Sequence, residues 1–246
     1  MRPTGLLSVT FRKMSAEEII ELTARAGLNG IEWGGDVHVR PGELEQAERI
    51  RRAVKAAGLV NFAYGSYWRA DREPEMIAET AEALGSQWIR IWAGVHPSSL
   101  CTPEERRQTV ENLKTLCRRV PKGMNVAAEW HCNTLTDTAT SALRLLDEVG
   151  EKNFTCYFQR EPRTDDRRDN LRDLLRIPPE KLQAVHVHYC VGRERKPLSD
   201  GAGEWRELLS HIPAQVPALL EFVKDDLIDQ YLKDASVLKE LAAEGK

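Results

Sequence analysis

The chain has 246 residues, of which 41% are hydrophobic and 30% are charged, the balance of an ordinary globular protein. This length is short for two average domains and typical of a single α/β barrel. A formal net charge of −3 argues against a dedicated nucleic-acid-binding protein, whose binding surface would be basic. No apolar run is long enough to cross a membrane, and the N-terminus lacks the apolar stretch of a signal peptide.

The cysteines carry no signature of a disulfide framework or of a structural zinc site. Their number is odd, and no pair has C-x-x-C spacing. They are Cys101, Cys117, Cys132, Cys156 and Cys190. We therefore expect reduced thiols, a cytoplasmic protein and a core that folds without a cross-link or a metal ion.

Eight short runs rich in apolar, β-branched and aromatic residues predict eight strands. In chain order they are LLSVTF (6–11), GIEW (30–33), LVNFAYGS (59–66), WIRIWAG (88–94), NVAAEWH (125–131), FTCYFQ (154–159), QAVHVHYC (183–190) and VPALLEFV (216–223). Their starts recur at intervals of roughly 24–37 residues, which is the length of one strand with one helix.

Helices are predicted between these strands, and several of their ends are readable. Residues 15–18 and 102–105 match the capping box, and Pro103 suits a first helical position. Four glycines follow helical patterns where a left-handed residue closes a helix, and the last helix is expected from about residue 225 to 243. These glycines are Gly27, Gly58, Gly85 and Gly150.

Eight strands alternating with eight helices predict one (β/α)₈ TIM barrel, a single domain over residues 1–246. The competing doubly wound sheet would usually carry a glycine-rich strand-to-helix turn, and no such motif follows any predicted strand. Residues 160–172 form the densest charge run, and we expect a solvated loop and helix start there.

Reactive side chains stand at the ends of the last four predicted strands, where a barrel carries its chemistry. The fifth strand ends with Glu129 and His131 on one face, because side chains alternate along a strand. Glu221 lies in the eighth strand, flanked by apolar residues. A carboxylate in such surroundings is costly unless it is paired or bound to a cation. A salt bridge to Arg90 is the structural alternative for such a glutamate.

Two more strand ends add donors of the kind that metal ions take. The sixth strand ends in Gln159, and the seventh carries His186 and His188 on one face. Together with Glu129 and Glu221, these side chains predict a divalent metal site for Mn²⁺, Mg²⁺, Co²⁺ or Zn²⁺. A lone histidine on a strand is more often a hydrogen-bonded core residue, so the prediction depends on all of these positions together.

The stretches at the strand ends resemble a known family. They are similar to the sugar phosphate isomerase/epimerase group of xylose-isomerase-like TIM barrels. The stretches that carry the resemblance are GIEWGGDVHV, YGSYWR, IRIWAG, AEWHCNTLTDT, YFQREP and HVHYC with KPLSDGAGEW. The resemblance implies that Glu129 and Glu221 are the two glutamates of a metal site and that a histidine of the HVH run is its imidazole ligand. In the related ketose 3-epimerases, the two glutamates also act as acid and base.

The sequence departs from that family at one ligand. The better-studied epimerases have an aspartate on the sixth strand, where this chain has Gln159. Losing one negative charge weakens the affinity for a divalent ion, which motivates the alternative of a non-catalytic sugar-binding barrel. Whether His186 or His188 is the ligand stays open.

A more distant branch of this superfamily contains apurinic-site endonucleases with three zinc ions, which use extra histidines on the third and fourth strands. Here the third strand ends with Tyr64, and the fourth strand carries Arg90 and Trp92. Neither strand supports a trinuclear site. The acidic net charge agrees, so we expect no nucleic-acid partner.

We therefore expect a metal-assisted isomerase or epimerase, which moves a proton next to the carbonyl of a small sugar or sugar phosphate. The alternatives are a sugar-acid or polyol dehydratase or lyase on the same site, and the sugar-binding barrel. No membrane partner is expected, and a homodimer suits this type of barrel. The candidate catalytic residues are Glu129, Glu221 and His131, and the candidate substrate contacts are Glu32, Trp33, His38, Trp68, Arg90 and Arg193.

Overall fold

The computed structural model describes residues 1–160 and 167–244. Within these residues, eight parallel strands close a barrel in the order β1-β10-β7-β6-β5-β4-β3-β2. The strands are β1 (Thr4–Leu7), β2 (Gly30–Gly34), β3 (Val60–Gly65), β4 (Trp88–Ile91), β5 (Asn125–Glu129), β6 (Phe154–Gln159), β7 (Leu182–Val187) and β10 (Ala218–Leu220). This closed parallel sheet confirms the predicted (β/α)₈ barrel and excludes the open doubly wound sheet.

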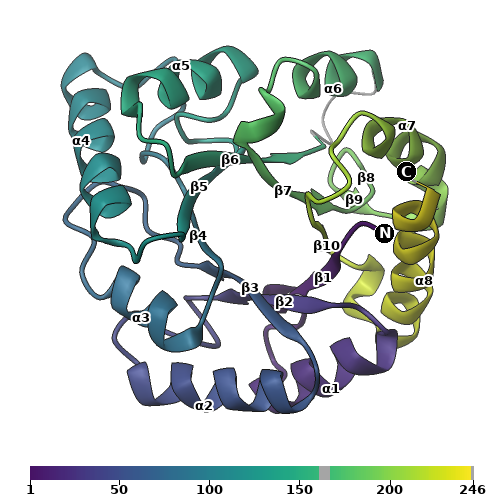
Figure 1. Cartoon of the computed structure of the whole chain (residues 1–246). Helices are drawn as coiled ribbons and strands as arrows, with labels where there is room; N and C mark the ends of the chain where they lie inside the picture. The colour runs from purple at the N-terminus through teal and green to yellow at the C-terminus, as the bar shows by residue number, and fades with distance from the viewer. Residues whose placement is uncertain (161–166, 245–246) are drawn as a thin grey trace. The chain divides into compact units, whose positions relative to one another are not determined.

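A helix follows each barrel strand along the described chain (Figure 1). The α-helices are α1 (Ala16–Ala26), α2 (Leu44–Ala56), α3 (Ile77–Leu84), α4 (Pro103–Arg119), α5 (Ala139–Val149), α6 (Arg167–Leu174), α7 (Ala202–Ser210) and α8 (Ile228–Glu244). Short 3₁₀ turns are η1 (Ser8–Phe11), η2 (Pro179–Lys181), η3 (Leu198–Gly201) and η4 (Lys224–Asp226), and β8 (Cys190–Val191) pairs with β9 (Glu194–Arg195) as a hairpin.

The predicted helix signals act locally, as expected. Both capping boxes are formed: Ser15 begins α1 and Thr102 begins α4, each exchanging hydrogen bonds with the glutamate three residues later. Gly27, Gly85 and Gly150 close their helices with φ between 64° and 70°, and Gly58 has φ 71° after α2. A residue with a Cβ would be strained at these positions.

The chain forms two compact units. The first contains Met1–Glu32, Val54–Val60 and Phe158–Lys246, and the second contains Trp33–Ala53 and Asn61–Tyr157. In the first unit β1 pairs with β10 and β10 with β7, and helices α7 and α8 pack against each other (Figure 1). In the second unit β3, β4 and β5 pair in succession.

Several predicted strands end earlier than expected. The first stops at Leu7, and residues 8–11 turn into η1. The seventh stops at Val187, and Cys190 begins the hairpin instead of extending the barrel strand. The eighth is short, ending at Leu220, so Glu221 lies immediately beyond it. These early ends place His188 and Glu221 on the segments that follow the strands.

One surface prediction is wrong at its first residue. Arg160, which opens the charge run 160–172, is 4% exposed, because a buried carboxylate and a backbone carbonyl bind its guanidinium. Residues 161–166 of this run lie outside the described residues. Among the residues the structure describes, no helix is long and apolar enough to cross a bilayer. All five cysteines are free.

Candidate active site

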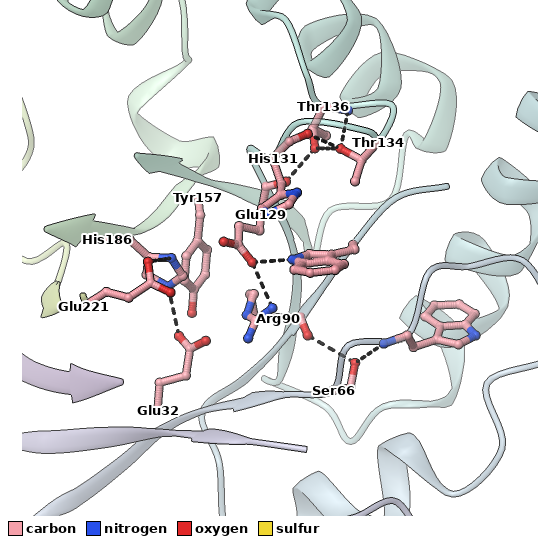
Figure 2. Close-up of polar contacts among 12 residues, drawn as sticks. Glu32, Ser66, Arg90, Glu129, His131, Thr134, Thr136, Tyr157, His186 and Glu221 are labelled. Atoms are coloured by element: carbon pink, nitrogen blue, oxygen red, sulfur yellow. Dashed lines mark hydrogen bonds and ion pairs between the residues drawn. The ribbon is translucent and has the colours of Figure 1, made fainter. Parts of the chain in front are cut away.

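Glu129, at the end of β5, is the centre of a polar cluster in the second unit. One of its carboxylate oxygens, Oε2, accepts a hydrogen bond from Arg90 Nη1 at 2.8 Å and another from Trp92 Nε1 at 2.6 Å. Figure 2 shows the contact between Arg90 and this carboxylate. Arg90 and Glu129 are almost fully buried, with side chains 2% and 5% exposed. The salt bridge considered as the structural alternative is thus formed.

Neighbouring groups hold this ion pair in place. The Arg90 guanidinium lies 4.6 Å from the centre of the Tyr67 ring, and Arg90 and Glu129 come from the adjacent strands β4 and β5. Each buried charge needs its partner, because an unpaired ion in the interior is strongly destabilising. The second unit therefore keeps Glu129 as an anion whose charge is locally balanced.

His131 lies two residues beyond Glu129 and is half-buried. Its ring stacks on Trp92, with the centres 4.3 Å apart and the planes at 24°. His131 Nδ1 is 2.6 Å from the carbonyl oxygen of Cys132. A carbonyl can only accept, so in the neutral ring this contact places the proton on Nδ1 and the lone pair on Nε2. The arrangement suits a general base.

Two threonines fix the backbone of this segment. The Thr136 hydroxyl donates to the carbonyl of Glu129 at 2.5 Å, and the Thr134 hydroxyl donates to the carbonyl of His131 at 2.6 Å. The two hydroxyls lie 2.9 Å apart. The carbonyls of Glu129 and His131 are thereby satisfied after the strand ends, and the segment that carries both side chains is held in one conformation.

The first unit contains a second cluster, formed by one imidazole between two carboxylates (Figure 2). His186 Nε2 is 3.4 Å from Oε2 of Glu32, and His186 Nδ1 is 3.6 Å from Oε2 of Glu221. The His186 side chain is fully buried, and those of Glu32 and Glu221 are 1% and 7% exposed. Register explains the placement: His186 pairs with Leu219 and Glu32 with Leu7, while the Glu221 N–H bonds the Val187 carbonyl.

The donors of this cluster fit a divalent ion, which the resemblance implies. The His186 Nδ1 to Glu221 Oε2 distance exceeds a hydrogen bond and matches two donors that share one cation. Glu32 then accepts from the other ring nitrogen, as carboxylates behind metal-bound histidines do. Within the described residues, no three His, Cys, Asp or Glu side chains form a complete metal site. That Glu221 and His186 hold a divalent ion stays a prediction.

The choice between the two histidines is clearer in the structure. His186 is the one between the two carboxylates. His188 is also buried, with its ring edge-on to Phe222 at 5.6 Å and its carbonyl bonded by the Trp205 indole at 2.8 Å. Gln159 ends β6 and is half-buried. That Gln159, His188 and Glu129 also bind the metal stays a prediction.

The predicted substrate contacts fall into two groups. Trp33 and Trp68 are buried, with their indole N–H groups bound by the Asn61 side chain and the Arg72 carbonyl. Both have core positions, and that either ring stacks on a sugar stays a prediction. His38 is buried edge-on to Trp33, whereas Arg193 is exposed at the tip of the β8–β9 hairpin.

Sequence reasoning missed two partnerships. The indole of Trp92 donates to Glu129 and its ring stacks on His131. The carboxylate of Glu32 faces His186 across a sequence separation of 154 residues, and its predicted contact with substrate stays a prediction. Only the first had a usable signal, because Trp92 stands two residues beyond Arg90, just past the end of β4.

Comparison with known proteins now adds to this geometry. Residues 20–241 match the family model described as the xylose isomerase-like TIM barrel. The chain belongs to this family. A curated relative, a 3-dehydroshikimate dehydratase from Bacillus anthracis, is 31% identical over 164 residues, which cover 61% of this chain and 59% of that protein.

Several solved structures share the fold. The probable 3-dehydroshikimate dehydratase AsbF of Bacillus anthracis has a TM-score of 0.75 at 21% identity, covering 97% of this chain and 99% of that one. A D-allulose 3-epimerase from Methylomonas sp. has a TM-score of 0.72 at 16% identity, covering 99% and 98%. The protein IolI, solved with a bound zinc atom, has a TM-score of 0.76 at 14% identity, covering 100% and 99%.

Proposed function

We propose that this family member is a dehydratase, which removes water from a small polyhydroxy keto acid by taking a proton next to its carbonyl. The observation that carries the proposal is His131, an imidazole whose Nδ1 is occupied by a carbonyl and whose Nε2 is left as a base. The sequence relationship to a 3-dehydroshikimate dehydratase supports this reaction ahead of isomerisation.

In the proposed elimination, His131 acts first as the base and then as the acid, so that every atom and electron is accounted for. His131 Nε2 takes the proton from the carbon next to the carbonyl, and the electrons of that C–H bond form an enolate. As the carbonyl re-forms, a carbon–carbon double bond develops and the carbon–oxygen bond of the β-hydroxyl breaks. The imidazolium returns its proton to the departing oxygen, so water leaves and nothing is oxidised or reduced.

The elimination needs a base and a group that stabilises negative charge, and each unit contains a candidate for one of these roles. When bound, a divalent ion polarises a substrate carbonyl and stabilises the negative charge that develops on its oxygen. Glu221 and His186 would hold it, with Glu32 orienting the imidazole. The Arg90–Glu129 pair holds Trp92, and Trp92 supports the His131 ring.

The test is to incubate the purified protein with 3-dehydroshikimate in the presence of Mn²⁺, Mg²⁺, Co²⁺ or Zn²⁺ in turn. Mass spectrometry should show loss of one water, and ultraviolet absorbance should show the aromatic dihydroxy acid that forms on tautomerisation. The variant H131Q should lose this activity. No loss of water with any of these ions would contradict the proposal.

An epimerase is the second candidate, because carboxylates stand at the ends of both β5 and β10 and an epimerase shares the fold. Ketohexoses and their phosphates should then give products of unchanged mass but altered chromatographic mobility. Binding of such sugars without any turnover would favour the sugar-binding barrel.

A further inference from the structure

The segment that follows β7 continues into a small hairpin next to His188. Strands β8 and β9 pair antiparallel, with Cys190 opposite Arg195, and Gly192 turns between them with φ 60°. The Lys196 N–H bonds the Tyr189 carbonyl at 2.8 Å, which closes the base of the hairpin. A change in the position of this hairpin would therefore also shift His188, which is two residues before β8.

The base of the hairpin is anchored in the interior. Arg160 Nε donates to both carboxylate oxygens of Glu204 at 2.9 Å, and its Nη1 donates to the Cys190 carbonyl at 2.8 Å. The guanidinium also lies 5.0 Å from the centre of the Tyr189 ring. That ring occupies the space a side chain would need at Gly201, where an added Cβ would fall 2.2 Å from it. The base is thus held by buried groups on two sides.

Strand β9 of the hairpin is held differently, by an exposed latch formed by Arg195, Phe222 and Asp226. Arg195 Nη1 is 2.6 Å from Asp226 Oδ1, and its guanidinium lies 4.7 Å from the centre of the Phe222 ring. The side chains of Arg195 and Asp226 are 37% and 57% exposed. Phe222 in turn meets the His188 ring edge-on at 5.6 Å.

The backbone on the far side of this latch is in an unfavourable conformation. Phe222, Asp225 and Asp226 have φ of 54°, 57° and 52°, in the left-handed region that residues with a Cβ rarely adopt. Phe222 directly follows Glu221 in the chain. Contacts from elsewhere must hold such a segment, and Arg195 supplies two of them.

We propose that Arg195 is a positioning residue. Through the latch, Arg195 holds Phe222 against His188 and keeps the neighbouring Glu221 oriented. This inference rests on the function proposed for the cluster of Glu32, His186 and Glu221. Because the base of the hairpin is anchored by buried groups, Arg195 has a fixed position. Its contacts with Phe222 and Asp226 therefore fix the loop after β10.

Hydrogen exchange measured by mass spectrometry on the full chain tests the latch without any substrate. In R195Q, amides of residues 190–195 and 221–227 should exchange about fivefold faster, since both contacts are lost, and in D226N about twofold faster. The double variant should exchange no faster than R195Q, because both changes break one latch. The matched control is E194Q, whose carboxylate pairs with Lys196 inside the hairpin. Unchanged exchange in R195Q overturns the proposal.

Turnover separates the latch from the proposed reaction. With 3-dehydroshikimate, R195Q should lower kcat about fivefold with little change in KM, and R195K should recover part of the loss because lysine keeps a cation over Phe222 and beside Asp226. If the wild type shows no turnover while R195Q still exchanges faster, the proposed function fails and the latch stands. If the wild type is active and R195Q has the same kcat, the positioning role is overturned.

Discussion

The two clusters at the strand ends differ in their balance of charge. In the second unit Glu129 meets a guanidinium at 2.8 Å and an indole N–H at 2.6 Å. In the first unit Glu32 and Glu221 face a single imidazole. Two carboxylates beside one imidazole are donors of the kind that a divalent cation takes, whereas Glu129 has a cationic partner in Arg90. The first arrangement favours a bound cation, and the second contains His131, the candidate base.

Among the variants that test this comparison, replacing His131 should have the largest effect on kcat. H131Q keeps a polar side chain but loses the base, so kcat should fall by about 10²–10⁴-fold, the range for a lost general base. Steady-state kinetics with 3-dehydroshikimate measures this loss. The control C132A retains the backbone carbonyl that Nδ1 contacts and should keep nearly full kcat. An active H131Q would show that the second unit's cluster does not supply the base.

Breaking the neutral pair should mainly cost stability. R90M leaves Glu129 buried without its cation, and the free energy of unfolding should drop by about 3–5 kcal/mol. Urea denaturation measures this, and R90M/E129Q should recover much of the loss because no buried charge remains. As a control, R118M breaks an ion pair with Glu151 in which the arginine is 66% exposed, and should cost at most about 1 kcal/mol. Equal losses in R90M and R118M would contradict a buried, interdependent pair.

The proposed cation-binding role of the first unit's cluster can be tested by metal affinity. E32Q removes the carboxylate behind His186, and the affinity for Mn²⁺ or Zn²⁺ should weaken about 10–100-fold. E221Q, which removes a direct donor, should weaken it at least as much. Titration calorimetry of protein purified without chelators gives these values, with E180Q as an exposed control. Affinities that are the same in wild type, E32Q and E221Q would place the cation elsewhere.

Asp234 should give the smallest effect, through pH. It is buried in α8, where burial raises the pKa of its carboxyl above the usual 3.8, although the Leu198 N–H at 2.9 Å opposes this. The folded state then binds the proton more tightly, so stability falls as pH rises from the unfolded pKa to the raised folded pKa. D234N can still accept from Leu198 and should flatten the dependence of Tm on pH in that window. An unchanged pH dependence would contradict the raised pKa.

Much of the fold could be predicted because its signals are local. Each capping box spans four residues, and each closing glycine acts on the helix turn just before it. The early end of the seventh strand was not predictable in this way. The run from Gln183 to Cys190 keeps the alternation of a strand, and only the hairpin closure by Lys196 and the Trp205 indole redirects it after Val187.

The sequence alone determined which residue types stand at the strand ends: carboxylates, imidazoles and one amide at positions that alternate toward one face. Only the tertiary structure decided their partners. Glu32 faces His186, Glu129 is neutralised by Arg90, and Arg160 is buried against Glu204 within a run that reads as solvated surface. The reason is physical: strand and cap propensities act within a few residues, whereas the electrostatic state of a buried group depends on neighbours that strand register brings in from far along the chain.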